Sequence, residues 1–179
     1  VYVKGALERL LPLCVEALAA DGKTTRIDHA AIEKVAHSYA GQGMRVLLLA
    51  RKNSDFGQNF RLTVEGIEKL TLIGLVGMID PPRKAAIGAI RNCHSAGVRV
   101  KMITGDHAVT ALAIAHQIGL NAEHALTGRE LAELDDTALA EVAHTVDVFA
   151  RVEPEQKLRL VRALQSRGEP TDAIAVNWQ

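Results

Sequence analysis

Aromatic side chains are scarce in this sequence, at 3% of 179 residues, although hydrophobic residues make up 48% of it. We therefore expect a core built from alanine, valine, leucine and isoleucine, in one domain or in one small domain plus part of another. Net charge is lacking too, because 21 basic residues balance 21 acidic ones. A neutral chain gives no electrostatic reason to expect nucleic acid or an anionic membrane surface as a partner.

Cysteines and long apolar runs are also few. Cys14 and Cys93 lie far apart and fit no metal or redox spacing, which predicts reduced thiols in a cytosolic setting. The longest apolar run, residues 70–79, is too short to cross a bilayer. The sequence contains no H-E-x-x-H or G-x-S-x-G motif and no signal peptide. Because it begins at Val1 without a methionine, we expect a piece of something longer.

Apolar periodicity gives the expected elements. In the first part it predicts strands at residues 1–3, 44–50 and 70–79 and helices at 7–14 and 28–40. After residues 80–83 the pattern becomes a regular alternation, with strands at 98–103, 146–150 and 173–176 and helices at 83–96, 107–118 and 154–166. A turn and short helices are expected over 126–134 and 136–143. Such alternation indicates an α/β fold with a parallel sheet and helices on both faces.

The strand predicted at residues 98–103 ends in Thr104-Gly105-Asp106, at the start of a helix. In parallel sheets ligands bind at the carboxyl ends of the strands, and helix N-termini attract anions. A phosphate or metal corner is therefore one interpretation. The other is an ordinary helix start that Asp106 caps with nothing bound, and these three residues alone favour it.

Five motifs change that balance when they are taken together. They are Lys4-Gly5-Ala6, Gly43-Met44-Arg45, Asp80-Pro81-Pro82-Arg83, Met102-Ile103-Thr104-Gly105-Asp106 and the run from Phe149 to Lys157. In this order and spacing, over residues 1–168, the chain resembles the cytoplasmic part of P-type cation-transporting ATPases, and most closely their calcium-pump-like branch.

The resemblance implies a domain plan. Residues 1–79 would form the C-terminal part of an α+β nucleotide-binding (N) domain, and residues 80–83, with Asp80 and Arg83, a hinge. Residues 84–179 would form most of a phosphorylation (P) domain with a parallel sheet of the haloacid-dehalogenase-like type. The parent protein would couple ATP hydrolysis, through an aspartyl phosphate, to transport of a cation.

The resemblance also implies site residues. Lys4 would lie beside the adenine, Arg45 would reach the nucleotide's phosphates, and Arg151 would lie near the ribose and the phosphates. Thr104 would hold the transferred phosphoryl group, Gly105 would give it a backbone contact, and Asp106 would organise nucleotide and Mg²⁺. Lys157 would neutralise the acyl phosphate. Thr104, Asp106 and Lys157 are thus the candidate catalytic residues, with ATP and Mg²⁺ as cofactors of the parent.

The sequence also departs from that family. It contains no D-K-T-G-T string with the nucleophilic aspartate, and residues 169–179 do not match the family's magnesium-binding T-G-D-G-x-N-D. We therefore expect no metal ligands and no turnover from this chain. Its partners would be ATP, the rest of the same polypeptide and, through absent membrane helices, the transported cation. Its location would be the cytoplasmic face of a membrane, and the unpaired edge of an incomplete sheet could form a dimer.

Two other classes of protein stay open. A soluble haloacid-dehalogenase-type phosphatase would share the threonine and lysine positions, but it needs an early D-x-D, and none precedes Thr104. A non-catalytic module that binds nucleotide would need none of the missing motifs. Affinity for ATP separates them, since tight binding favours a module and millimolar or no binding favours the pump fragment.

Overall fold

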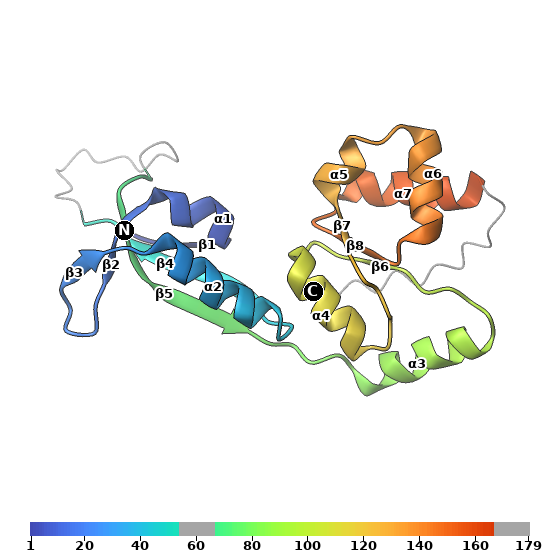
Figure 1. Ribbon diagram of the computed structural model, residues 1–179, viewed down its shortest axis with the longest axis horizontal. Helices are drawn as coiled ribbons and strands as arrows, with labels where there is room; N and C mark the ends of the chain where they lie inside the picture. The colour runs from blue at the N-terminus through green and yellow to red at the C-terminus, as the bar shows by residue number, and fades with distance from the viewer. Residues whose placement is uncertain (54–66, 167–179) are drawn as a thin grey trace. The chain divides into compact units, whose positions relative to one another are not determined.

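The computed structural model describes residues 1–53 and 67–166, and these divide into two compact units (Figure 1). The first unit holds Val1–Tyr39 and the described residues of Met44–Met78. The second holds the turn Ala40–Gly43 and the described residues from Ile79 onward. The strand predicted at residues 173–176 and the tail 169–179 lie outside the described residues.

The first unit is built on a five-stranded sheet in the order β1-β4-β5-β2-β3. Its strands are β1 (Tyr2–Gly5), β2 (Cys14–Leu18), β3 (Thr24–Arg26), β4 (Arg45–Arg51) and β5 (Leu70–Met78). Only β2 and β5 pair in parallel. The sequence predicted β1, β4 and β5 but missed the β2–β3 hairpin, although Gly22 (φ +82°) supplies the positive φ of its turn.

One face of this sheet carries the core of the first unit. Leu48 and Ala50 are fully buried there with Leu70 and Leu72, under the short helix α1 (Leu7–Leu10) and the 3-10 turn η1 (Leu11–Leu13). The helix α2 (His29–Ala40) begins as predicted, because the Asp28 carboxylate accepts a hydrogen bond from the Ala31 N–H at 3.0 Å.

The second unit has a three-stranded parallel sheet in the order β6-β8-β7, which confirms the predicted parallel arrangement. The strands are β6 (Met102–Ile103), β7 (Leu126–Thr127) and β8 (Val148–Ala150). The helices are α3 (Lys84–Ser95), α4 (Ala108–Gln117), α5 (Gly128–Ala132), α6 (Asp136–Thr145) and α7 (Pro154–Ser166).

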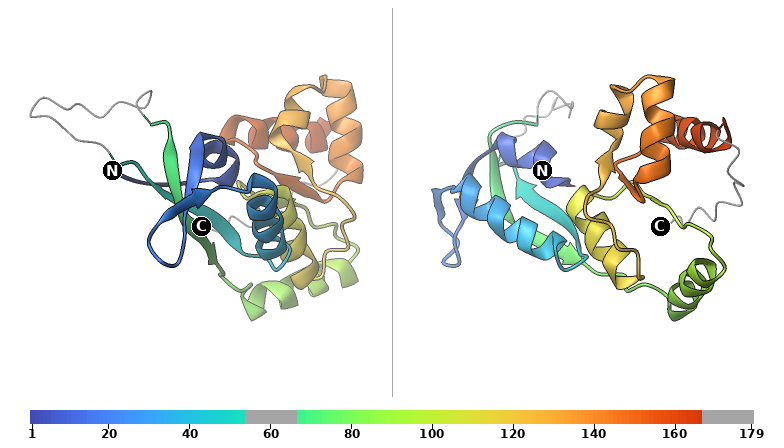
Figure 2. Two further views of the ribbon diagram at one scale, coloured as in Figure 1. Left: turned by 60° about the vertical axis from the view of Figure 1, so that its left-hand side comes forward. Right: turned by 45° about the vertical axis from the view of Figure 1, so that its right-hand side comes forward.

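Alternate residues of β8 separate two cores within this second unit. Val148 and Ala150 pack into a cluster with residues of α3 and α4, whereas Phe149 packs into a cluster with residues of α6 and α7. Successive side chains of a strand point to opposite faces of the sheet, so each core covers one face. The helices α6 and α7 lie side by side over the second of these faces (Figure 2).

The strand predicted at residues 98–103 is wrong for all but its last two residues. The Val98 N–H bonds to the Cys93 carbonyl at 2.8 Å and ends α3, while Lys101 Nζ reaches the Val146 carbonyl at 2.8 Å. Because β8 begins only at Val148, pairing starts at Met102, whose N–H donates to the Asp147 carbonyl at 2.7 Å. Backbone pairing, and not side-chain alternation, therefore sets the strand's start.

Within the described part of the chain, no helix is both long enough and apolar enough to span a bilayer.

Candidate functional site: a corner at the ends of two parallel strands

Thr104 and Asp106 form a hydrogen-bonded corner directly after β6. The Thr104 hydroxyl donates to Asp106 Oδ2 at 2.8 Å and accepts from the Asp106 N–H at 3.1 Å. Both side chains are buried, at 3% and 9% exposure. Asp106 does not cap α4, because the N-cap position belongs to His107, whose Nδ1 accepts from the Val109 N–H at 3.4 Å. The plain capping interpretation of Asp106 is therefore wrong.

The segment after β8 is bonded to this corner through the backbone. The Thr104 N–H donates to the Phe149 carbonyl at 2.9 Å, as part of the strand pairing. Beyond the strands, the Arg151 N–H donates to the Asp106 carbonyl and the Val152 N–H to the Thr104 carbonyl, both at 3.1 Å. Arg151 itself has a left-handed backbone (φ 54°) and an exposed side chain. The structure thus brings Thr104, Asp106 and Arg151 together.

Gly105 leaves open space in front of the corner. A Cβ built on this residue would meet no other described heavy atom within 4 Å, and its φ is not in the left-handed region. Neither neighbouring atoms nor backbone conformation therefore demands a glycine here. A bound group that approaches the backbone closely would demand one.

Lys157 lies in the first turn of α7, six residues beyond Arg151 along the chain. Its N–H donates to the Glu153 carbonyl at 3.1 Å, and its half-buried side chain has no hydrogen-bond or ion-pair partner among the residues described. An ammonium group without such a partner is available for a ligand's negative charge.

Lys4 and Arg45 belong to the first unit, where the strand register places them on one face of the sheet. Lys4 pairs with Leu49 of β4. Leu49, Leu47 and Arg45 are every second residue of β4, so their side chains lie on the same face as that of Lys4. This is the face opposite the buried Leu48. Both cations are exposed.

Apolar side chains accompany these cations on the same face. Val76 pairs with Leu47, and Met78 pairs with Arg45; they are 40% and 43% exposed. We call the face that carries Lys4, Arg45, Leu47, Leu49, Val76 and Met78 the open face. Sequence reasoning missed its apolar members, although the alternation in β4 and β5 could have shown them once strand pairing was known.

Asp80 and Arg83 lie in the connection between β5 and α3, and both are exposed. Arg83 occupies the N-cap position of α3 with an extended backbone (φ −65°, ψ 133°) and forms no side-chain cap. The two prolines between them restrict the backbone of this connection.

Gly128 and Gln156 are residues of the second unit that sequence reasoning missed. Gln156 Nε2 donates to the Gly128 carbonyl at 2.7 Å, and Gln156 Oε1 accepts from the Glu153 N–H at 3.0 Å. The capping box formed by Thr127 and Glu130 at the start of α5 was a readable signal in the sequence for this helix. Nothing in the sequence links Gly128 to Gln156, which are 28 residues apart.

Metal ligands do not gather in this site. The part of the chain that the structure describes contains no group of three or more His, Cys, Asp or Glu side chains that could hold a metal ion. Asp106 Oδ2 already accepts the Thr104 hydroxyl.

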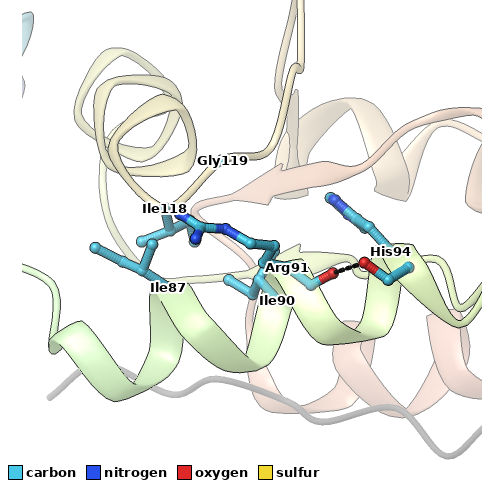
Figure 3. Close-up of a pocket in the computed structure, with 7 residues that line it drawn as sticks. Ile87, Ile90, Arg91, His94, Ile118 and Gly119 are labelled. Atoms are coloured by element: carbon cyan, nitrogen blue, oxygen red, sulfur yellow. Dashed lines mark hydrogen bonds between the residues drawn. The ribbon is translucent and has the colours of Figure 1, made fainter.

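A cavity of about 400 Å³ lies elsewhere in the second unit, between α3 and the end of α4 (Figure 3). Its lining consists of Ile87, Ile90, Arg91, His94, Ser95, Ile118 and Gly119. None of the residues singled out from the sequence lines it, so the cavity is separate from the corner.

Comparison with known proteins finds clear similarity to P-type ATPases. A family model described as "P-type ATPase, cytoplasmic domain N" matches residues 1–85. The chain is 48% identical over 179 residues to "Probable cation-transporting ATPase F" of Mycobacterium tuberculosis (strain ATCC 25618 / H37Rv), which covers 94% of this chain and 19% of that protein. It is 40% identical over 171 residues to "Calcium-transporting ATPase 1" of Bacillus cereus, with 92% and 19% covered.

A yeast relative extends the likeness beyond bacteria. "Calcium-transporting ATPase 1" of Saccharomyces cerevisiae is 42% identical over 178 residues, which are 94% of this chain and 18% of that protein. The chain thus spans less than one fifth of the length of these relatives. The resemblance seen in the sequence motifs is confirmed: the chain belongs to the P-type cation-transporting ATPases, and residues 1–85 match the family's cytoplasmic N domain.

Proposed function

We propose that the chain is the part of a cation-transporting P-type ATPase that binds ATP and holds its transferred phosphoryl group. Residues 1–79 are the C-terminal part of the N domain, residues 80–83 with Asp80 and Arg83 are the hinge, and residues 84–179 are most of a haloacid-dehalogenase-like P domain. The observation that carries the proposal is the corner in which Thr104, Asp106 and the segment after β8 are hydrogen-bonded together.

The residues of the corner suit phosphoryl transfer, which depends on positioning and on neutralising spread negative charge. The N–H of Gly105 can donate to phosphoryl oxygens. The Thr104 hydroxyl, whose only proton goes to Asp106 Oδ2 before a ligand binds, can donate to a phosphoryl oxygen when that proton turns to the ligand. Arg151 and Lys157 supply positive charge beside the strand ends. In the intact protein ATP would supply the phosphoryl group, and Mg²⁺ would help to neutralise its negative charge.

The open face of the first unit suits a nucleotide. A purine base needs an apolar surface, which Leu47, Leu49, Val76 and Met78 offer, and its phosphates need cations. Lys4 and Arg45 are exposed on this face, with Lys4 paired to the residue four positions beyond Arg45 in β4. At about 3.3 Å per residue this separates the two cations along the strand by roughly 13 Å, comparable with the length of a nucleoside triphosphate.

The chain does not complete the reaction by itself. Covalent catalysis in this family needs the aspartate of D-K-T-G-T, and these 179 residues do not contain that string. The parent's transported cation is selected by membrane helices beyond this sequence, and the parent's location is the membrane with this part on the cytoplasmic face.

Calorimetric titration with ATP and Mg²⁺ tests the proposal. We expect dissociation constants in the millimolar range and a weakening of at least about tenfold in Lys4→Ala and Arg45→Ala, since each variant removes one charge-assisted contact. The matched control is Lys34→Ala, an exposed lysine on α2, which should bind as the wild type does. Micromolar binding that neither substitution affects would contradict the proposal and favour an independent binding module.

Phosphoenzyme formation provides a second test. With radiolabelled ATP we expect no acid-stable, hydroxylamine-sensitive label on the chain, because the nucleophile is lacking. Hydrolysis of p-nitrophenyl phosphate by the chain would instead favour the soluble phosphatase.

Self-association is a further expectation. In the described sheet of the second unit, β6 and β7 are the edge strands. An edge with unpaired N–H and C=O groups can pair with a second copy of the chain. Sedimentation velocity over a range of concentrations would reveal such a dimer, and a concentration-independent monomer would rule it out.

A further inference from the structure

We infer that Gly128 and Gln156 are positioning residues for the phosphate corner: together they hold the turn from Arg151 to Gln156 against the start of α5. The inference rests on the proposed function of that corner. Neither residue carries a charge. Gly128 lies outside the five motifs, and Gln156 lies within the run from Phe149 to Lys157 but was given no role there. Their importance comes from where they touch the turn.

Gln156 ties the turn at two points. Its side-chain N–H donates to the Gly128 carbonyl at 2.7 Å, which anchors α7 to α5. Its side-chain carbonyl accepts from the Glu153 N–H at 3.0 Å, inside the turn itself. One half-buried side chain thus joins the first turn of α7, the turn that precedes it and the neighbouring helix.

Gly128 lets the turn come this close. A Cβ on Gly128 would overlap the carbonyl oxygen of Arg151 and would lie 2.6 Å from Gln156 Oε1. The first of these atoms is backbone and cannot move aside as the end of a flexible side chain could. Gly128 does not have a positive φ, so its role is close approach and not an unusual conformation.

The held turn contains a strained residue. Arg151 has a left-handed backbone (φ 54°), which is unfavourable for a non-glycine residue and persists only where neighbours impose it. On one side the N–H groups of Arg151 and Val152 bond to the corner at 3.1 Å. On the other side Gly128 and Gln156 contact the turn. The conformation that carries Arg151 into the corner is therefore fixed from both sides.

This placement matters because phosphoryl transfer relies on groups held in position before the ligand arrives. Arg151 opens the turn and Lys157 follows it directly, so both cations take their place from the turn's conformation. If the turn were loosened, the side chains of Arg151 and Lys157 would keep their charges but would sample more positions relative to the corner.

Two measurements on the isotope-labelled 179-residue chain test the inference. The first is hydrogen exchange of the Arg151 and Val152 amides, and the second is the affinity for inorganic phosphate by NMR titration. We expect Gln156→Met to speed exchange of both amides and to weaken phosphate binding by about tenfold each, as loss of the hydrogen bonds to Gly128 and Glu153 implies. Gly128→Ala should act like Gln156→Met.

Matched controls make the same chemical changes elsewhere. Gln165→Met alters an exposed glutamine of the same helix, and Gly88→Ala alters an exposed glycine in α3 with no atom within 4 Å of its Cβ position. Both should leave exchange and affinity unchanged. Unchanged exchange and affinity in Gln156→Met would overturn the inference, provided that Thr104→Val abolishes phosphate binding. Wild-type protein that does not bind phosphate, or a Thr104→Val variant that binds it normally, would instead overturn the proposed function of the corner and the inference with it.

Discussion

Thr104 and Asp106 bind each other twice: the hydroxyl of Thr104 donates to the carboxylate of Asp106 at 2.8 Å and accepts from its N–H at 3.1 Å. Both side chains are almost fully buried. Because the Thr104 hydroxyl both donates and accepts, its orientation is fixed, and the corner has one defined hydrogen-bonding pattern before any ligand binds.

Replacement of Thr104 by valine should destabilise the second unit by about 1–3 kcal/mol. Valine keeps the shape but removes the hydroxyl, which leaves a buried carboxylate oxygen of Asp106 without that donor. Urea denaturation followed by NMR signals of the second unit measures the loss. Thr104→Ser keeps the hydroxyl and should recover most of the stability, whereas a Thr104→Val variant as stable as the wild type would show that the bond contributes nothing.

Lys101 should stabilise the folded second unit, although it is a charged residue. Its side chain is only 9% exposed, and its ammonium donates to the carbonyls of His144 and Val146 and to Asp147 Oδ1 at 2.8–3.1 Å. These carbonyls lie at the end of α6, where a cation also interacts favourably with the helix dipole. We expect Lys101→Met to cost about 1–3 kcal/mol in the urea denaturation of the second unit.

The control for Lys101 is Lys84→Met, at the exposed start of α3. A surface lysine should change stability by no more than about 0.5 kcal/mol. Equal effects of the two substitutions would mean that the contacts at the end of α6 are not stabilising.

Glu130 should make the second unit slightly less stable in acid. Hydrogen bonds from the hydroxyl and N–H of Thr127, at 2.6 and 2.7 Å, hold the pKa of Glu130 below its ordinary value. Folding therefore favours the ionised form, and the contribution is complete above the unfolded-state pKa of about 4.3. It is lost as the pH falls through the lower folded-state pKa.

The measurement is the free energy of unfolding of wild type and Glu130→Gln from pH 7 to pH 3. Because Glu130 is exposed, we expect a difference of only about 0.5 kcal/mol at pH 7, shrinking toward zero below the ordinary glutamate range. A difference that grows in acid would contradict the sign of this effect.

The two thiols should differ in reactivity. Cys14 is buried and donates to the Leu10 carbonyl at 3.3 Å, and its burial raises the pKa of the thiol. Cys93 is only half-buried. Because the thiolate is the reactive species, iodoacetamide at neutral pH should label Cys93 at least about tenfold faster than Cys14. Mass spectrometry of timed reactions gives both rates, and rapid labelling of a Cys93→Ser variant would contradict the prediction.

Much of the second unit could be read from the sequence. Asp135 caps α6 through the Ala138 N–H at 2.8 Å, and Pro154 begins α7, as their residue types predict. Helix ends of this kind depend on residues within one turn of each other, so local sequence is sufficient. The long strands β4 and β5 were predictable because their apolar runs are bounded by polar or proline residues.

Features that depend on distant partners could not be read in the same way. The β2–β3 hairpin was missed because β2 owes its place to pairing with β5, more than 50 residues later in the chain. The strand at residues 98–103 was overextended because Arg99 and Lys101 alternate like strand residues but bond instead to the end of α6.

The sequence by itself determined the family, the alternation of strands and helices in the second unit, and the identity of Thr104, Asp106, Arg151 and Lys157 as candidates. Only the tertiary structure decided that Asp106 binds the Thr104 hydroxyl and does not cap α4, and that Gly128 and Gln156 hold the turn after β8. The physical reason is the distance along the chain between the residues that interact. Capping and periodicity act over a few residues, whereas close approach and strand pairing join segments whose separation along the chain carries no local signal.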